Sequence, residues 1–205
     1  MDRAIGRQSV TGAMLTRPRR LRRSALLLVV CLCVCARVEA QDKIDPMAAT
    51  VARTFGMIGW SFIGLADAMP AGKWSFKPTG GEFTDVRTFA EQVKHVACSN
   101  FGFFEPIEGT EPPEDCGSGG PHPATSKAEL MTYLRESFEY AGRVLGTMTP
   151  DNALDAIGGR YGVPGNNTRL GLATIAVWHA SDHYGQLVVY LRMNGIVPPA
   201  SRPPQ

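Results

Sequence analysis

The stretch that decides the fold is residues 174–199, TIAVWHASDHYGQLVVYLRMNGIVPP, because it combines a long helical pattern with two histidines. It belongs to a helix that we expect from about Leu170 to Asn194, ended by Gly195 and two prolines. Positions that advance by alternating three and four residues share one helix face. That face is predicted to point into a core, and it reads Leu172, Ile175, His179, His183, Gln186, Tyr190 and Met193.

Two imidazoles on one buried face need partners, because two neighbouring buried charges are costly. A divalent metal meets this need, since it binds neutral imidazole well through a pair four residues apart. Helical bundles complete such sites from a facing helix, and His95 is the best third ligand because His122 lies in the loop segment GGPHPA. The alternative is that each histidine is a core residue bonded to a nearby hydroxyl or carbonyl. The pair lacks the glutamate of an HExxH protease motif.

Three further segments carry helical periodicity. The second of them has a candidate N-cap at Thr84 or Asp85, and the third opens with a capping box of Ser126 and Glu129. A short helical turn is also expected around residues 152–157. The long helices are predicted over residues 46–69, 86–104 and 127–148.

The fold class that these segments indicate is all-α, because no segment alternates apolar and polar residues as a strand would. The Pro-, Gly- and acid-rich segment 105–126 is long for a connection, so we expect it to cross the molecule. Four helices with one long crossover between the second and third describe a four-helix bundle. We interpret Trp60 as a core residue of the first helix. An apolar face left uncovered on the first or third helix would permit a homodimer.

The N-terminal 40 residues have the three parts of a secretory signal peptide. A basic run, RPRRLRR (17–23), precedes an apolar run, SALLLVVCLCVCA (24–36), which is short for a membrane span. Val38 and Ala40 suit cleavage after Ala40, whereas Cys35 lacks the preceding small residues of a lipoprotein site. An uncleaved anchor is the alternative. We expect residues 1–40 to be removed, leaving no stable membrane anchor, and residues 41–205 to be periplasmic or extracellular.

Cleavage would reverse the sign of the net charge. The full chain has 21 basic and 19 acidic residues, and the leader carries 8 and 2 of them. The remaining 13 basic and 17 acidic residues give a net charge of −4, which does not favour binding to nucleic acid. About 165 residues suffice for one domain with a substantial core.

Two cysteines, Cys98 and Cys116, remain after the leader is removed. In an oxidising compartment they are candidates for a disulfide. The alternatives are that Cys98 is an inert buried thiol or a metal ligand one turn after His95.

The segments WHASDHYGQLVVYLRMNGIVPP (178–199) and KWSFKPTGGEFTDVRTFAEQVKHVACSNF (73–101) resemble the DinB-like (YfiT-type) superfamily of metalloenzymes. The resemblance covers nearly the whole of residues 41–205 and implies a bundle with a long crossover. It implies a divalent metal (zinc, nickel, iron or manganese) on His95, His179 and His183. Gln186 matches the last position of the family's HxxxHxxQ pattern, where it supports a ligand or packs beside it.

The function that we expect is that of an exported, metal-dependent DinB-like enzyme, of hydrolase or thiol-transferase type, acting on an unidentified small molecule. Three nitrogen ligands leave a coordination position open, as catalytic sites do. Export argues against transferases that use cytoplasmic thiols, and no catalytic side chain is assigned. The alternative is a non-catalytic exported bundle that binds a metal or a small ligand.

Overall fold

The computed structural model describes residues 46–82, 85–158 and 167–203, and the leader lies outside these ranges. Within them four long α-helices form the fold: α2 (Pro46–Ala68), α3 (Phe89–Phe104), α4 (Lys127–Leu145) and α5 (Arg169–Met193). Short 3₁₀ helices lie between or after them: η1 (Ala71–Lys73), η2 (Glu105–Glu108), η3 (Cys116–Ser118) and η4 (Pro199–Ser201). The described residues contain no β-strand, so the predicted all-α class is confirmed. None of the described helices has the length and apolarity to span a membrane.

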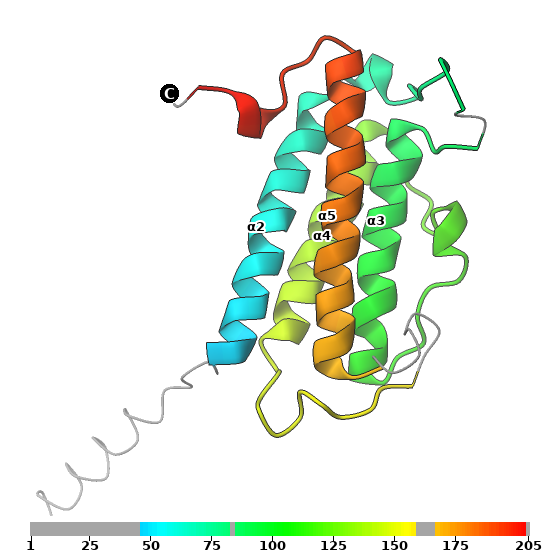
Figure 1. The fold of residues 1–205 in the computed structure, drawn as a ribbon. Helices are drawn as coiled ribbons and strands as arrows, with labels where there is room; N and C mark the ends of the chain where they lie inside the picture. Colours follow the sequence, from blue (N-terminus) through cyan, green and yellow to red (C-terminus); the bar gives the residue numbers. More distant parts are fainter. Residues whose placement is uncertain (1–45, 83–84, 159–166, 204–205) are drawn as a thin grey trace, which may run out of the picture. The chain divides into compact units, whose positions relative to one another are not determined.

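The helices pack side by side as a bundle, with α2 and α5 antiparallel to α3 and α4 (Figure 1). The first residues of α3 and α4 lie at the same end of the bundle, because Phe89 and Lys127 both contact the indole ring of Trp74. The segment between α3 and α4 therefore returns along the length of the bundle, as the sequence predicts for a crossover.

Both long helices that flank this crossover begin at capping boxes. At α4 the Ser126 hydroxyl accepts from the Glu129 amide, and the Glu129 carboxylate accepts from the Ser126 amide, as predicted. At α3 the predicted start is wrong: Thr88 is the N-cap, with Glu91 as its partner. This capping box satisfies two free amides at once, so it fixes the helix start more strongly than a lone N-cap at Asp85.

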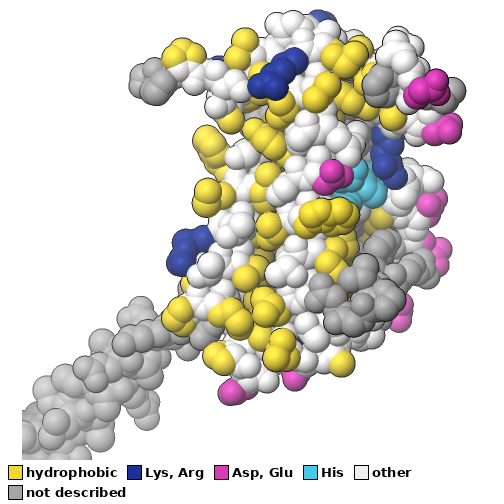
Figure 2. Space-filling model, viewed as in Figure 1, with side chains coloured by type: hydrophobic (Ala, Val, Ile, Leu, Met, Phe, Trp, Pro, Cys, Tyr) yellow, Lys and Arg dark blue, Asp and Glu magenta, His cyan; other side chains and the backbone are white. Residues whose placement is uncertain are grey.

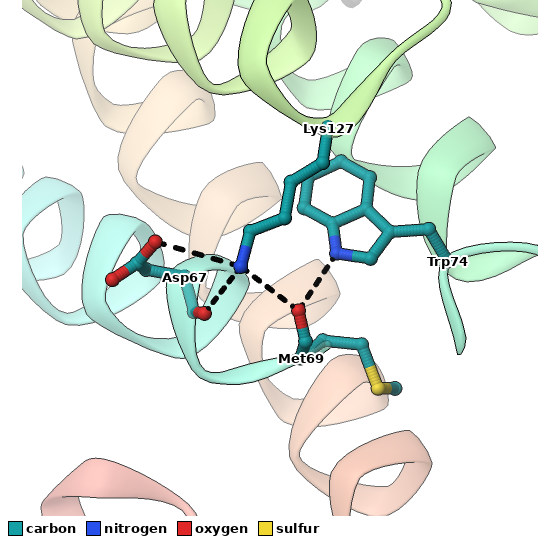
Figure 3. A network of polar contacts seen from close by, with 4 residues as sticks. All are labelled: Asp67, Met69, Trp74 and Lys127. Atoms are coloured by element: carbon teal, nitrogen blue, oxygen red, sulfur yellow. Dashed lines mark hydrogen bonds and ion pairs between the residues drawn. The ribbon is translucent and has the colours of Figure 1, made fainter. Parts of the chain in front are cut away.

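Lys127 closes the C-terminal end of α2 (Figure 3). Its ammonium donates to the carbonyl oxygens of Asp67 at 2.7 Å and Met69 at 3.0 Å, and it lies 3.6 Å from the Asp67 carboxylate. The Met69 carbonyl also accepts from the Trp74 indole nitrogen at 2.9 Å. A cation at the negative end of the helix dipole satisfies carbonyls that lack helical partners, and this fastens α4 to α2.

The core is centred on aromatic side chains from three helices. The Phe55 ring packs on Phe104 and Phe138, with centroids 5.5 and 5.2 Å apart. Gly59 lies against the same Phe138 ring, where an added Cβ would come within 2.8 Å of Cδ1. The interpretation of Trp60 as a core residue is wrong, since its side chain is 79% exposed. Gly59, one position before it, is the residue that faces the core.

The buried face of α5 is rotated from the predicted one. Its fully buried members include Ala173, Ala176 and Ala180, whereas Gln186 and Met193 are exposed. Small side chains allow α5 to approach its neighbours closely, so the alanines occupy the centre of the interface. Leu172, His183 and Tyr190 are buried as predicted and belong to both faces, whereas Ile175 and His179 are only partly buried.

The connection between α4 and α5 contains a single turn that begins at Thr149, three residues before the predicted helical turn at residues 152–157: the Ala153 amide donates to the Thr149 carbonyl oxygen at 2.9 Å, four residues back as in an α-helix. Asn152 and Thr149 exchange side-chain to backbone hydrogen bonds in the reciprocal pattern of a capping box. Ala156 then pairs with Thr168 in an isolated antiparallel bridge. The turn ends at Leu154, so the chain does not continue as a helix over residues 155–158.

Candidate metal centre

Three histidines from two helices meet in the middle of the bundle. His95 lies on α3, and His179 and His183 lie one turn apart on α5. One nitrogen from each ring lies within 4.8 Å of the other two. The ring centroids are 4.6–4.9 Å apart. The structure therefore brings together the three histidines that the sequence analysis selected.

The proton position on His95 is fixed by its backbone partner. The Nδ1 atom lies 2.6 Å from the carbonyl oxygen of Cys116. A carbonyl oxygen only accepts, so Nδ1 carries the proton and Nε2 carries a lone pair. This lone pair faces His179, whose Nε2 atom is 3.0 Å away.

His183 is oriented by a relay of amide side chains. Its Nδ1 lies 2.6 Å from Gln92 Oε1, Gln92 Nε2 donates to Gln186 Oε1 at 2.9 Å, and Gln186 Nε2 donates to Asp182 at 2.8 Å. An ionised carboxylate only accepts, so each amide in the relay has one possible orientation. Nδ1 of His183 therefore donates its proton to Gln92, and its Nε2 lone pair is free for another partner.

Gln92 is the site residue that the sequence analysis missed. It is 3% exposed, and a buried amide needs partners. Its position three residues before His95 on α3 was the available signal, since residues at that spacing share a face. Gln186, assigned from the resemblance, is joined to His183 through Gln92 in this relay, and its side chain also acts directly on the His183 ring, whose pKa it raises slightly against the effect of burial.

The third histidine, His179, has no anchoring partner for its outer nitrogen. Its Nδ1 is buried and forms no hydrogen bond within the described residues. The ring packs edge-on against Phe103, with centroids 5.4 Å apart. Its inner nitrogen and that of His95 are too close for two lone pairs to face each other, so a proton or a cation must lie between them.

All three imidazoles are held neutral. Burial, together with the smaller effect of the neighbouring histidines, lowers the pKa of His179 to about 3; burial and the smaller effect of His95 lower the pKa of His183 to about 4. Burial also lowers the pKa of His95, although the bond to the Cys116 carbonyl opposes this. The Arg87 guanidinium adds a smaller repulsion at each ring. Neutral imidazoles have the lone pairs that a metal requires.

The donor set fits a divalent transition metal. Two of the Nε2 lone pairs are oriented by oxygen acceptors on the opposite ring nitrogen, which is the usual support for metal-binding histidines. Three nitrogen donors leave room for at least one further ligand. His95 and His179 are only partly buried, and Figure 2 shows histidine surface open to solvent beside acidic, basic and hydrophobic side chains. The cluster is therefore able to hold a metal that solvent or a ligand can reach.

Other candidate residues lie outside the cluster. The His122 ring stacks on Tyr133 with centroids 3.7 Å apart, and its Nδ1 accepts from the Ala124 amide. Cys98 and Cys116 are joined by a disulfide, with Cα atoms 5.4 Å apart. A disulfide sulfur is not a thiolate ligand, so Cys98 does not extend the cluster.

Fold and site together define an all-α helical protein with a three-histidine cluster able to hold a metal. The family model of the DinB superfamily matches residues 61–187, more than half of the chain. The chain belongs to the DinB superfamily, and the matched segment contains all three histidines, Gln92 and Gln186. The comparison with curated proteins returned no match.

Proposed function

We propose that this chain is an exported metal-dependent enzyme that binds one divalent ion through His95, His179 and His183. The observation that carries the proposal is the orientation of His95 and His183. Each donates its Nδ1 proton to an oxygen, 2.6 Å away in both cases, and keeps its Nε2 lone pair for the cluster. Of the metals that the resemblance implies, zinc, nickel and iron suit imidazole donors, whereas manganese favours oxygen ligands.

A divalent ion at this position would supply Lewis acidity, which lowers the pKa of a water or thiol ligand and polarises a substrate carbonyl or phosphoryl group. The protein's own contribution is to fix the ligands. Cys116 and Gln92 hold two rings in one tautomer, and burial keeps all three rings unprotonated at neutral pH. The Arg87 guanidinium adds positive charge near the cluster, which favours an anionic group on a small-molecule substrate.

The reaction class is hydrolase or thiol transferase, and export favours the hydrolase. Two observations support export: the signal-peptide pattern of residues 1–40 and a disulfide, which persists in oxidising compartments. Cleavage after Ala40 would leave a chain with a net charge of −4, for which nucleic acid is not a natural partner. N-terminal sequencing of the protein recovered from the periplasm or medium tests the cleavage site.

The alternative is a non-catalytic exported protein that binds a metal or small ligand. The position of the acidic side chain near the cluster supports this alternative. The acidic side chain whose charge acts on His183 is Asp182. It is exposed, and its carboxylate already accepts a hydrogen bond from Gln186. A general base must lie within hydrogen-bond reach of the nucleophile, and the bond from Gln186 directs Asp182 toward the relay instead.

A homodimer also belongs to the proposal. Trp60 and Met57 on α2 are 79% and 71% exposed. Beside Trp60 is an open cavity of about 320 Å³ between α2 and α4, with Phe55 and Phe138 in its lining. A twofold arrangement could place the indole of each protomer against the cavity of the other.

Elemental analysis of the purified protein tests the metal site. We expect about one divalent ion per chain, absent from the triple variant His95→Ala, His179→Ala, His183→Ala. A folded wild-type protein that contains no metal and takes up no added zinc, nickel or manganese would refute the proposal. Turnover of ester, amide or phosphoester substrates by the metal-loaded protein, lost in the triple variant, would separate the enzyme from the non-catalytic alternative.

A further inference from the structure

The 3₁₀ turn η3 is fastened to α3 beside the histidine cluster. Cys116, the first residue of η3, forms a disulfide with Cys98 and accepts the His95 Nδ1 proton on its carbonyl oxygen. His95 and Cys98 are three residues apart on α3, so they are neighbours on one helix face. Cys116 therefore makes both links to α3: the disulfide to Cys98 and the hydrogen bond to His95, one helical turn apart.

The two residues after the turn must be glycine for the chain to lie this close to α3. Gly119 and Gly120 both have positive φ, at 94° and 72°. A Cβ on Gly120 would collide with Cys98 Sγ, and one on Gly119 would press against the Lys94 side chain. Glycine is thus required both by the backbone conformation and by the close approach of the chain to the disulfide.

The three histidines differ in what holds their outer nitrogen. Gln92, the partner of His183, belongs to α3, and the helix itself fixes its position. The partner of His95 belongs to the crossover, residues 105–126, which would vary in position without a tie. Besides the disulfide, the Arg87 guanidinium ties this turn by donating to the Gly117 carbonyl at 3.1 and 2.7 Å.

We propose that the Cys98–Cys116 disulfide is a positioning element of the metal centre. It fixes the Cys116 carbonyl, which holds His95 in the form that is protonated on Nδ1 and directs Nε2 toward His179. Its effect on metal affinity rests on the proposed function, whereas its effect on the His95 tautomer does not. Loss of the oxygen acceptor behind a metal-binding histidine typically weakens metal binding 10- to 100-fold.

Imidazole ¹⁵N shifts of the metal-free protein and zinc affinity by chelator competition test the proposal. The variant is Cys98→Ala with Cys116→Ala, and Ser126→Ala, which removes a helix cap away from η3, is the control for lost stability. In the double variant we expect His95 to populate both tautomers, His183 to keep its single tautomer, and zinc to bind 10- to 100-fold more weakly. In Ser126→Ala both histidines and the zinc affinity should match wild type within about twofold.

A second measurement does not depend on refolding of the double variant. Metal-free wild type is incubated with a water-soluble phosphine until alkylation and intact mass show that the buried disulfide has become two thiols, with water supplying the protons and the oxygen of the phosphine oxide. After reduction we expect His95 to populate both tautomers and His183 to keep its single tautomer. An unchanged His95 tautomer, or equal changes at His95 and His183, would overturn the positioning role. A selective change at His95 in a protein that binds no zinc would uphold that role and refute the proposed metal function.

Discussion

Gln92 Oε1 accepts the Nδ1 proton of His183 at 2.6 Å, which joins α3 to α5 through a side chain that is not itself a metal ligand. The bond extends through Gln186 to the carboxylate of Asp182. Because the carboxylate at the end of this relay can only accept, each donor in the relay has one possible direction. Its negative charge also raises the basicity of the His183 ring as a metal ligand. The orientation of the last helix is thus set by hydrogen bonding as well as by the apolar contacts of its alanines.

Replacing Gln92 by Met should weaken zinc binding by about 10- to 100-fold, because His183 loses the acceptor that fixes its tautomer. Methionine keeps the side chain's length and suits a buried position. Gln186→Met leaves the Gln92 acceptor of the His183 Nδ1 proton in place, so it should have a clearly smaller effect. Zinc affinities from chelator competition on the three proteins provide the measurement. Equal losses in the two variants would mean that the relay acts as a unit rather than through Gln92.

Replacing His183 by Ala should abolish metal uptake and the rise in melting temperature that zinc causes in wild type. A ligand that binds only the folded state stabilises it, by about 2.7 kcal/mol at a concentration 100 times its Kd. His122→Ala is the matched control, because its ring stacks on Tyr133 outside the cluster. Both variants are compared by elemental analysis and by thermal melts with and without zinc. Metal retained by His183→Ala would disprove the ligand assignment.

The helices and the histidine cluster were predictable because they rest on local patterns. The spacing of His179 and His183 places both on one face whichever partner the helix meets. Helix starts follow from capping chemistry. The predicted start at Ser126 is confirmed, and the start at Thr88 also has a capping box, formed with Glu91, that the sequence contains. Periodicity alone could not locate the centre of the buried face of α5. Alanine is weakly hydrophobic, yet it fits best where two helices approach closely.

The tertiary partners of the site could not be derived in this way. The acceptor for His95 is a backbone carbonyl 21 residues away in the crossover, and a backbone carbonyl has no residue-specific signature. Trp60 looked like a core residue because its type is usually buried. Burial on α2 is decided by which side faces α4, and Gly59 occupies that side.

Gly59→Ala and Gly64→Ala should change stability in opposite directions, although both glycines lie within α2. The added methyl group at Gly59 meets the Phe138 ring, which is 8% exposed and already packs on Phe55 and Phe62. Overpacking of this kind costs about 1–3 kcal/mol. At Gly64 nothing lies within 4 Å, so the helix gains about 0.5–1 kcal/mol. The midpoints of urea unfolding, compared at unchanged m-value, measure the stability of both variants. If the midpoint shifts in the same direction in both, the packing described at Gly59 is contradicted.

Trp60→Glu should convert the proposed homodimer to a monomer without loss of folding. Burying a carboxylate against the Phe55 and Phe138 rings of the cavity is costly, whereas the exposed Trp60 contributes little to the core of one chain. Light scattering after size-exclusion chromatography gives the mass of each protein. Trp178→Glu, also at an exposed tryptophan but on α5, is the control and should remain dimeric. A monomeric wild type would rule the dimer out.

The metal-free protein should lose stability as the pH falls from about 6.5 toward 4. An unfolded histidine has a pKa near 6.5, whereas burial lowers the pKa of His179 to about 3 and that of His183 to about 4 in the folded chain. Between these values the unfolded state binds more protons, so the free energy of unfolding decreases as the pH falls. The loss is up to about 2 kcal/mol at pH 5 for each histidine that stays neutral when folded.

Comparison with the variant His179→Leu, His183→Leu isolates this effect. Glu129 also has a lowered pKa, about 2, because it accepts bonds from the Ser126 and Thr125 amides. Its contribution is lost only below about pH 4.5 and is common to both proteins, so it cancels in the difference. Urea unfolding at pH 7, 6 and 5 should show a steeper decline for wild type than for the variant. Parallel declines would mean that the two rings are protonated in the folded state, and protonated imidazoles could not be the metal ligands at those pH values.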